Sequence, residues 1–213
     1  MTKWLPSTQS LWILPAAALA TAGAYEPARL TRGSVDRIPF NVAAAGLVVL
    51  DVTIDDRGSV SSIGVVKDVD PFGSILKEAV GGWEFEAARE DGRAAESHIV
   101  VAGLFRPAML LFPAPSGLRP PDTEPPQSMP YPASVAVPPY PPTAIGDDAV
   151  LVEMEVNDAG TVEQARVVGG KTSAFNSPAL DAARAWVFRP ARKGGRAVPS
   201  RVYVVFSFRA PTT

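Results

Sequence analysis

Two stretches of the chain alternate apolar and polar residues with a period of two, the pattern of strands that bury one face. In the stretch 150–156 the apolar face holds Val150, Val152, Met154 and Val156. The other face holds Leu151, Glu153 and Glu155, so we expect it to be mostly polar. A glycine-containing turn at 157–160 leads to a return strand at 162–168, which predicts a hairpin. Residues 48–66 show the same pattern around a turn at 55–58.

A short alanine-rich helix is predicted after the second hairpin. Ser177 is placed to be its N-cap and Pro178 to be its first residue. Leu180, Ala183 and Trp186 would hold this helix against the sheet, and Pro190 and the pair 194–195 then force a loop. The final strand, 200–208, carries apolar residues on one face, namely Val202, Val204, Phe206 and Phe208.

The two halves of the chain repeat each other. Residues 48–66 align without gaps on 150–168, and further on Trp83 aligns with Trp186 and Phe105 with Phe208. Repetition over this length predicts two copies of one small module. We therefore expect an α+β protein made of two tandem β-β-α-β modules, each a three-stranded antiparallel sheet packed on one helix. The modules would span 35–107 and 138–210, joined by a proline-rich linker at 108–137.

Composition narrows the possible functions. The 213 residues carry a net charge of −2, and a dedicated nucleic-acid binder usually has a basic excess. The chain has no cysteine and one histidine, His98, which argues against thiolate chemistry and most zinc or hydrolase sites. No acid–base or nucleophile cluster is visible. We expect no enzyme, no cofactor and no metal site, and we expect His98 to be a surface residue.

The N-terminus predicts export. Lys3 precedes an apolar stretch at 11–19, and two A-x-A sites follow at 20–24, as in a cleaved signal peptide covering residues 1–24. An uncleaved anchor is the alternative, although the stretch 11–24 has only 14 residues, is interrupted by Pro15 and is short for a membrane span. In both cases the bulk of the chain would lie in the periplasm or an equivalent compartment.

The second half resembles the C-terminal domain of the TonB family. The residues that carry the resemblance are "PPYPPTA" from Pro138, the hairpin with its Asp158-Ala159-Gly160 turn, "WVFRP" from Trp186 and "VYVVFSF" from Val202. The first half resembles the same domain more loosely, without the tyrosine-proline lead-in. Family members that transduce energy carry a membrane-spanning helix with a histidine, and this N-terminus has no histidine.

The resemblance implies a periplasmic domain that captures a short peptide, the TonB box, of outer-membrane transporters. The peptide would add as a strand beside the last strand of the domain. The implied partner-binding residues are Val137, Tyr140, Arg201, Val202, Tyr203, Val204, Val205, Phe206 and Phe208. Val137 stands where the family has a glutamine that contacts the peptide. If the N-terminus anchors the chain, inner-membrane motor proteins become further partners.

The last strand is expected to have an open outer edge, because nothing later in the chain can cover it. An open edge rich in Val, Tyr and Phe recruits another strand. The alternative function is therefore a structural envelope module that pairs with a second copy of itself through the same edge. We expect the second module to fold independently of the first.

Two further groups of residues have candidate roles. A basic patch without intervening acidic residues could face an acidic partner or simply water, and it comprises Arg184, Arg189, Arg192, Lys193 and Arg196. The aromatic residues of the two repeated W-x-F motifs are expected to form the structural core. They are Trp83, Phe85, Trp186 and Phe188.

Overall fold

The computed structural model describes residues 25–35, 38–40, 42, 44–106 and 124–211. The predicted signal peptide, residues 1–24, lies outside the described residues. The fold is α+β, with two α-helices and mostly antiparallel strand pairs. Each half contributes a hairpin, a helix and a long last strand, in that order. None of the helices in the described ranges is long and apolar enough to cross a membrane.

One continuous six-stranded sheet forms the centre of the molecule, in the order β11-β10-β15-β8-β3-β4. The first half supplies β3 (Gly46–Ile54), β4 (Val60–Lys67) and β8 (Ser97–Phe105). The second half supplies β10 (Asp148–Val156), β11 (Val162–Gly169) and β15 (Ser200–Phe208). The expected pair of separate three-stranded sheets is therefore wrong, because β8 and β15 join the two halves in parallel.

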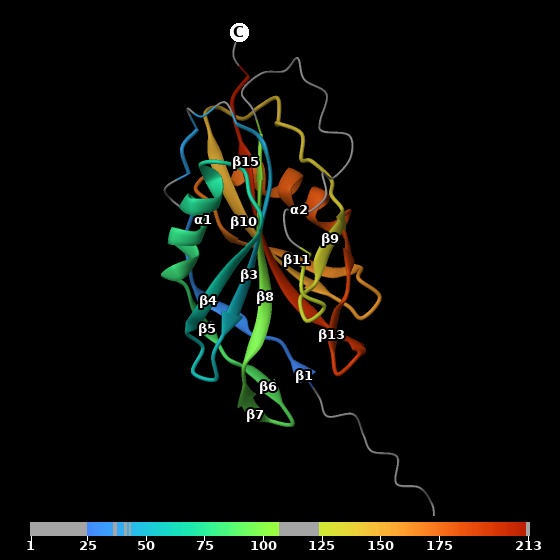
Figure 1. The fold of residues 1–213 in the computed structure, drawn as a ribbon. Coiled ribbons are helices and arrows are strands. Elements are labelled where there is room, and N and C mark those ends of the chain that lie inside the picture. Colours follow the sequence, from blue (N-terminus) through green and yellow to red (C-terminus); the bar gives the residue numbers. More distant parts are fainter. Residues whose placement is uncertain (1–24, 36–37, 41, 43, 107–123, 212–213) are drawn as a thin grey trace, which may run out of the picture.

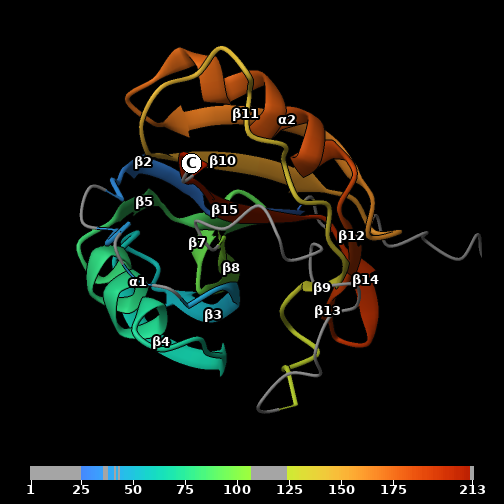
Figure 2. The ribbon, with the colours of Figure 1, turned by 90° about the horizontal axis from the view of Figure 1, so that it is seen from above.

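The two helices cover opposite faces of this sheet. Helix α1 (Phe72–Gly81) lies on one side and α2 (Asn176–Arg184) on the other, as the views from the front and from above show (Figures 1 and 2). This arrangement follows from the parallel junction. If the two halves are related by a rotation about an axis along β8 and β15, the face that carries a helix in one half becomes the opposite face in the other.

Each hydrophobic core is shared between the halves. Beneath α1, the core includes Leu151, Tyr203 and Val205 from the second half. Beneath α2, it includes Val49, Val100 and other residues of the first half. The face of β10 that holds Leu151 and Glu153 was expected to be mostly polar. Both residues are buried, with 0% and 3% of their surface exposed, because the first half covers this face.

Short strands surround the main sheet and repeat between the halves. In the first half they are β1 (Tyr25–Glu26), β2 (Arg29–Arg32), β5 (Glu84–Glu86), β6 (Ala88–Glu90) and β7 (Arg93–Ala95). In the second half they are β9 (Tyr131–Ser134), β12 (Val187–Arg189), β13 (Ala191–Lys193) and β14 (Arg196–Val198). The segment β2 pairs with β5 as β9 pairs with β12. Strands β1 and β2 thus lie before residue 35, where the first module was expected to begin. Strand β9 likewise lies before residue 138, the expected start of the second module.

The turn glycines serve two purposes. Gly58 and Gly160 have φ angles of +84° and +82°, as the predicted hairpin turns require. A Cβ on Gly160 would lie 1.9 Å from the carbonyl oxygen of Phe188, and the same clash occurs between Gly58 and Phe85. The Phe188 amide donates to the Gly160 carbonyl at 2.8 Å. The hairpin turn therefore docks the W-x-F segment against the sheet.

The predicted N-cap of the second helix is wrong. Helix α2 begins at Asn176, and a 3-10 turn at Ser173–Phe175 leads into it, so Ser177 lies inside the helix. The fully buried ring of Phe175 stacks on Phe208, with 4.6 Å between the ring centroids. Aromatic packing, rather than a side-chain cap, thus anchors the start of this helix. In the first half, Phe72 stacks on Phe105 in the same way.

Candidate binding surfaces

The last strand, β15, has no free edge in this structure. One side pairs with β10 along its whole length, from Ser200 to Phe208. The other side pairs with β8, with Val202 opposite Val100 and Phe206 opposite Leu104. The expected open outer edge is therefore wrong. The sequence argument considered only residues that follow β15, whereas the strand that covers it comes from earlier in the chain.

The predicted partner-binding residues of β15 are buried or nearly so. The residues from Val202 to Phe206 and Phe208 are fully buried, with Tyr203 and Val205 pointing into the core beneath α1. Arg201, at the start of the strand, pairs with Glu155 at 3.2 Å and donates to the carbonyl of Pro27 at 2.9 Å. These side chains hold the two halves together.

A buried polar network crosses the junction between the halves. The Tyr203 hydroxyl donates to Glu153 at 2.9 Å and accepts from the Leu30 amide at 2.7 Å. Arg166 donates two hydrogen bonds to the same carboxylate, at 2.8 and 2.9 Å. Burial, followed by the negative charge of Glu153, raises the pKa of Tyr203, so this hydroxyl remains a donor. Sequence analysis missed this network, although Glu153 and Tyr203 already stood on the same face of neighbouring predicted strands.

The lead-in to the second half packs against its helix. Val137 and Tyr140 are partly buried against the core beneath α2. The Tyr140 ring contacts Phe175 edge to face at 5.4 Å between centroids, and its hydroxyl donates to the Gly146 carbonyl. Both residues follow β9 in the chain and contact the core beneath α2.

The predicted basic patch consists mainly of cations with partners inside the chain. Arg184 pairs with Asp181 on α2, and Arg192 donates to the carbonyl of Gly195. Arg189 donates to the carbonyl of Pro125 at 3.0 Å, and Lys193 pairs with Glu90 at 2.7 Å. Arg196 is exposed at the start of β14. Of these contacts, that of Arg189 with Pro125 and that of Lys193 with Glu90 join β12 and β13 to distant parts of the chain.

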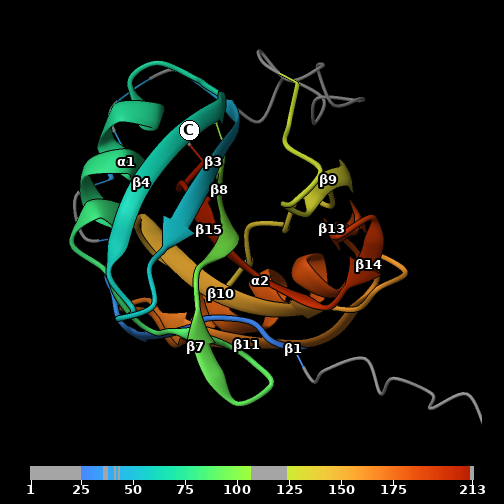
Figure 3. The same ribbon diagram turned by 60° about the horizontal axis from the view of Figure 1, so that its bottom comes forward.

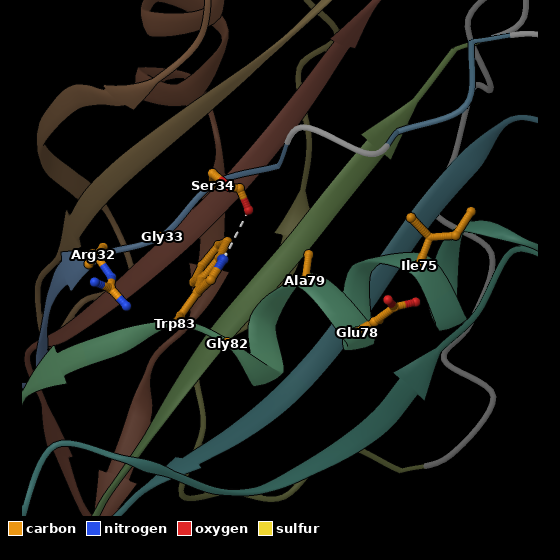
Figure 4. A pocket seen from close by; sticks show the side chains of 8 residues that line it. All are labelled: Arg32, Gly33, Ser34, Ile75, Glu78, Ala79, Gly82 and Trp83. Carbon is orange, nitrogen blue, oxygen red and sulfur yellow. Dashed lines mark hydrogen bonds between the residues drawn. The ribbon is translucent and has the colours of Figure 1, made fainter.

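The aromatic residues of the W-x-F motifs lie in the core. Trp83 and Phe85 are 4% and 6% exposed, and Trp186 and Phe188 are 1% and 2% exposed. Each indole donates to a lead-in carbonyl, Trp83 to that of Ser34 and Trp186 to that of Ala136. A groove of about 770 Å³ runs along α1 beside Trp83, between Arg32 and Glu78 (Figure 4). The buried indole forms part of its wall and offers little surface for stacking.

The free edges of the main sheet are β4 and β11, because each pairs on one side only. Figure 3 shows β4 at the outer side of the sheet, next to α1. The pairing of each edge strand with its neighbour carries two register shifts, which interrupt the regular ladder near both ends of β4 and of β11. Bulges of this kind protect an edge from pairing with other chains. The regular stretch between the bulges of β4 is Ser62–Val65, which is short.

The two edges differ in charge. From Val60 to Val66, β4 carries no charged residue, whereas β11 carries Glu163 and Arg166. Val65 is also one of the exposed large hydrophobic residues, with 37% of its surface accessible. Charged side chains guard an edge, and their absence leaves it open to an added strand. Sequence analysis missed β4 as a candidate, although the charge-free run was visible.

A polar pair joins β3 and β8 in the first half. His98 Nδ1 and Asp51 Oδ1 are 3.0 Å apart, and 32% of the His98 side chain is exposed. The hydrogen bond to Asp51 raises the pKa of His98, against a smaller opposite effect of burial. No group of three or more His, Cys, Asp or Glu side chains that could hold a metal is found within the described ranges.

Comparison with known proteins identifies one family. Residues 137–210 match the family described as Gram-negative bacterial TonB protein C-terminal. This match covers β10, β11, α2 and β15, together with the lead-in at Val137 and Tyr140. The match supports a TonB C-terminal domain in the second half of the chain. No curated protein matches the chain.

Proposed function

We propose that this protein is a non-catalytic, TonB-like module of the Gram-negative envelope that binds a short peptide of an outer-membrane transporter in support of transport. The family match at residues 137–210 supports the envelope setting and the class of partner. We further propose that the peptide adds as a strand at the free edge of β4. The observation that carries this choice is the strand order, which leaves β15 inside the sheet and β4 at its end.

Capture at β15 would require the two halves to separate. Separation would expose Tyr203, Val205 and Leu151 to water, together with the apolar residues of the first half that lie beneath α2. Each fully buried aliphatic or aromatic side chain contributes about 1.5–3 kcal/mol to stability. The sum exceeds what pairing with a short peptide would return, so the junction stays closed and the partner binds elsewhere.

The edge of β4 suits a short peptide. Its four regular residues, Ser62–Val65, offer main-chain groups for a few hydrogen bonds, and the flanking bulges limit the length of an added strand. Main-chain bonds would supply the affinity, and an apolar residue of the peptide would contact Val65. A second copy of the chain could use the same edge, which corresponds to the alternative of a self-associating envelope module.

The test is a titration of the full chain with synthetic peptides that carry the TonB box of outer-membrane transporters. A lysine in place of Val65 puts a charge at the edge, so Val65→Lys should weaken peptide binding at least ten-fold. Gln164→Lys, an exposed position on β11, is the matched control and should bind as the wild type does. Equal binding by Val65→Lys and the wild type would refute the β4 site.

Measurement of the molecular mass in solution distinguishes between the two candidate partners, a transporter peptide and a second copy of the chain. A monomer that binds peptide supports capture of a transporter segment. A dimer that Val65→Lys converts to a monomer, and that binds no peptide, would instead support the self-associating module. Absence of both activities would contradict the proposed function.

A further inference from the structure

The two edge strands of the main sheet differ at one position that faces a carboxylate of the neighbouring strand. The alignment of the two halves places Gly64 of β4 where β11 has Arg166. The same alignment places Asp51 of β3 where β10 has Glu153. The strand pairing is equivalent, because Gly64 lies opposite Asp51 and Arg166 lies opposite Glu153. A Cβ built on Gly64 would lie 3.9 Å from the Cβ of Asp51, so both residues belong to the same face of the sheet.

In the second half, the edge strand supplies a cation to this carboxylate. Arg166 donates to both oxygens of Glu153, at 2.8 and 2.9 Å, which is the strong bidentate form of an ion pair. In the first half, Gly64 has no side chain to donate. Within the described ranges, the carboxylate of Asp51 has one hydrogen-bond partner, His98, at 3.0 Å. Histidine is a cation only while it is protonated, so Asp51 lacks the permanent cation that its counterpart has.

The carboxylate of Asp51 is accessible from the edge of the sheet. The Asp51 side chain is 13% exposed, and Gly64 is exposed on the edge strand. Ser62 lies two residues before Gly64 on the same face, and its short side chain donates to the Thr53 hydroxyl at 2.9 Å. Gly64 therefore leaves a gap in the row of side chains between Asp51 and the outer edge of β4.

A strand added beside β4 would place one of its residues next to Gly64. Neighbouring strands lie about 4.8 Å apart, so this residue would be about 9.6 Å from Asp51, two strands away. Lysine and arginine carry their charge at the end of a long stem, which can cross over a glycine. Shorter side chains end before the carboxylate, and an acidic side chain would be repelled by it.

We propose that the β4 edge selects a peptide with a lysine or arginine opposite Gly64, and that Asp51 is the residue that recognises this cation. The cation of the peptide pairs with Asp51 across Gly64, in the way that Arg166 pairs with Glu153 in the second half. The peptide residues on either side of the cation point to the other face of the sheet, where an apolar side chain contacts Val65. This inference rests on the proposed β4 site and names the class of peptide that the site takes.

Calorimetric titration of the full chain with a host peptide tests the preference. The peptide is acetyl-Gly-Ser-Thr-Val-Xaa-Val-Thr-Gly-Ser-amide, in which the two valines face Val65 and Xaa therefore faces Gly64. We expect the peptide with lysine at Xaa to bind about five-fold more tightly than that with glutamine, as for a partly exposed ion pair, and the peptide with glutamate to bind more weakly than both. Equal binding of the three peptides would overturn this inference and leave the β4 site standing. If none of the three binds, both the β4 site and the inference are overturned.

Variants of the protein locate the preference. Asp51→Asn should reduce the preference for lysine over glutamine to below about two-fold, and binding of the glutamine peptide should stay unchanged. Asp56→Asn, in the exposed hairpin turn, removes the same charge elsewhere and should keep the preference. A preference for lysine that survives in Asp51→Asn would overturn the role of Asp51.

A second variant introduces into the first half the residue found in the second. Gly64→Arg should place a guanidinium on Asp51 and so abolish the preference for lysine over glutamine. The strand has room for this side chain, because the atoms nearest to an added Cβ lie at 3.8 and 3.9 Å. Gly64→Ala is the control, which adds a Cβ without charge and should keep the preference. Retention of the preference in Gly64→Arg would contradict the proposed contact.

Discussion

The ring of Tyr203, on the last strand of the second half, meets the indole of Trp83, in the first half, edge to face with 6.1 Å between the centroids. Phe85 contacts the same tyrosine ring at 5.9 Å. A side chain of the TonB-like half thus completes the core of the other half. The two halves are therefore parts of one folding unit, and the expected independent folding of the second half is not supported by this packing.

The Tyr203 hydroxyl should contribute measurably to stability. Tyr203→Phe keeps the ring but leaves the Leu30 amide and one Glu153 oxygen without this partner. We expect the free energy of unfolding to fall by about 1–3 kcal/mol, as measured by denaturant titration. Tyr140→Phe is the matched control, because its hydroxyl bond to Gly146 is exposed, and it should change stability by less. Equal effects would show that the buried network is not formed in solution.

Shared cores predict a single unfolding transition. Trp83→Ala and Trp186→Ala each remove a buried indole, and each should destabilise the chain by about 3–5 kcal/mol. Because each core contains residues of both halves, either substitution should shift the same transition, followed by circular dichroism and by the fluorescence of the remaining tryptophans. A second half that stays folded after the first has melted in Trp83→Ala would contradict the shared core.

The pair of His98 and Asp51 predicts a pH dependence of stability. The pKa of His98 is raised in the folded state, so the pair stabilises the fold fully below the unfolded pKa of about 6.5. This contribution is lost as the pH rises through the folded pKa. His98→Gln should therefore lower the free energy of unfolding more at pH 5.5 than at pH 8.5, by on the order of 0.5–1 kcal/mol for a partly exposed pair.

Unfolding titrations at the two pH values measure this difference. Asp51→Asn removes the acceptor of the pair and should abolish the same pH-dependent contribution. If the wild type and His98→Gln differ by the same amount at both pH values, the charged pair does not form.

Proline substitutions test whether β8 and β15 are both inner strands. Val204→Pro and Val101→Pro each remove a backbone donor from a strand that has neighbours on both sides. We expect each to prevent folding or to lower stability by several kcal/mol. Gly103 on β8 lies against the Phe105 ring, where a Cβ would lie 2.5 Å from a ring atom. Gln164→Pro on the edge strand β11 provides the comparison, with circular dichroism as the measurement.

Local features of the fold were readable from the sequence. Alternation predicted the hairpins, and the positive φ of Gly58 and Gly160 agrees with the predicted turns. The helix and last strand of each half follow in the expected order. These features depend on contacts between residues close in the chain, and side-chain periodicity and turn preferences encode such contacts directly.

The tertiary structure alone decided that β8 covers β15. Pairing along a strand edge uses main-chain groups, which are nearly the same for every residue. The sequence therefore does not specify which strand will lie beside a given edge. The available signals were Leu151, on a face of β10 that was expected to be mostly polar, and the apolar side chains of Tyr203 and Val205 on the second face of β15. Those side chains needed a covering surface, and only the three-dimensional packing revealed that the first half supplies it. The same junction places Val100 opposite Val202, because residues about a hundred positions apart become neighbours only when the two halves share one sheet.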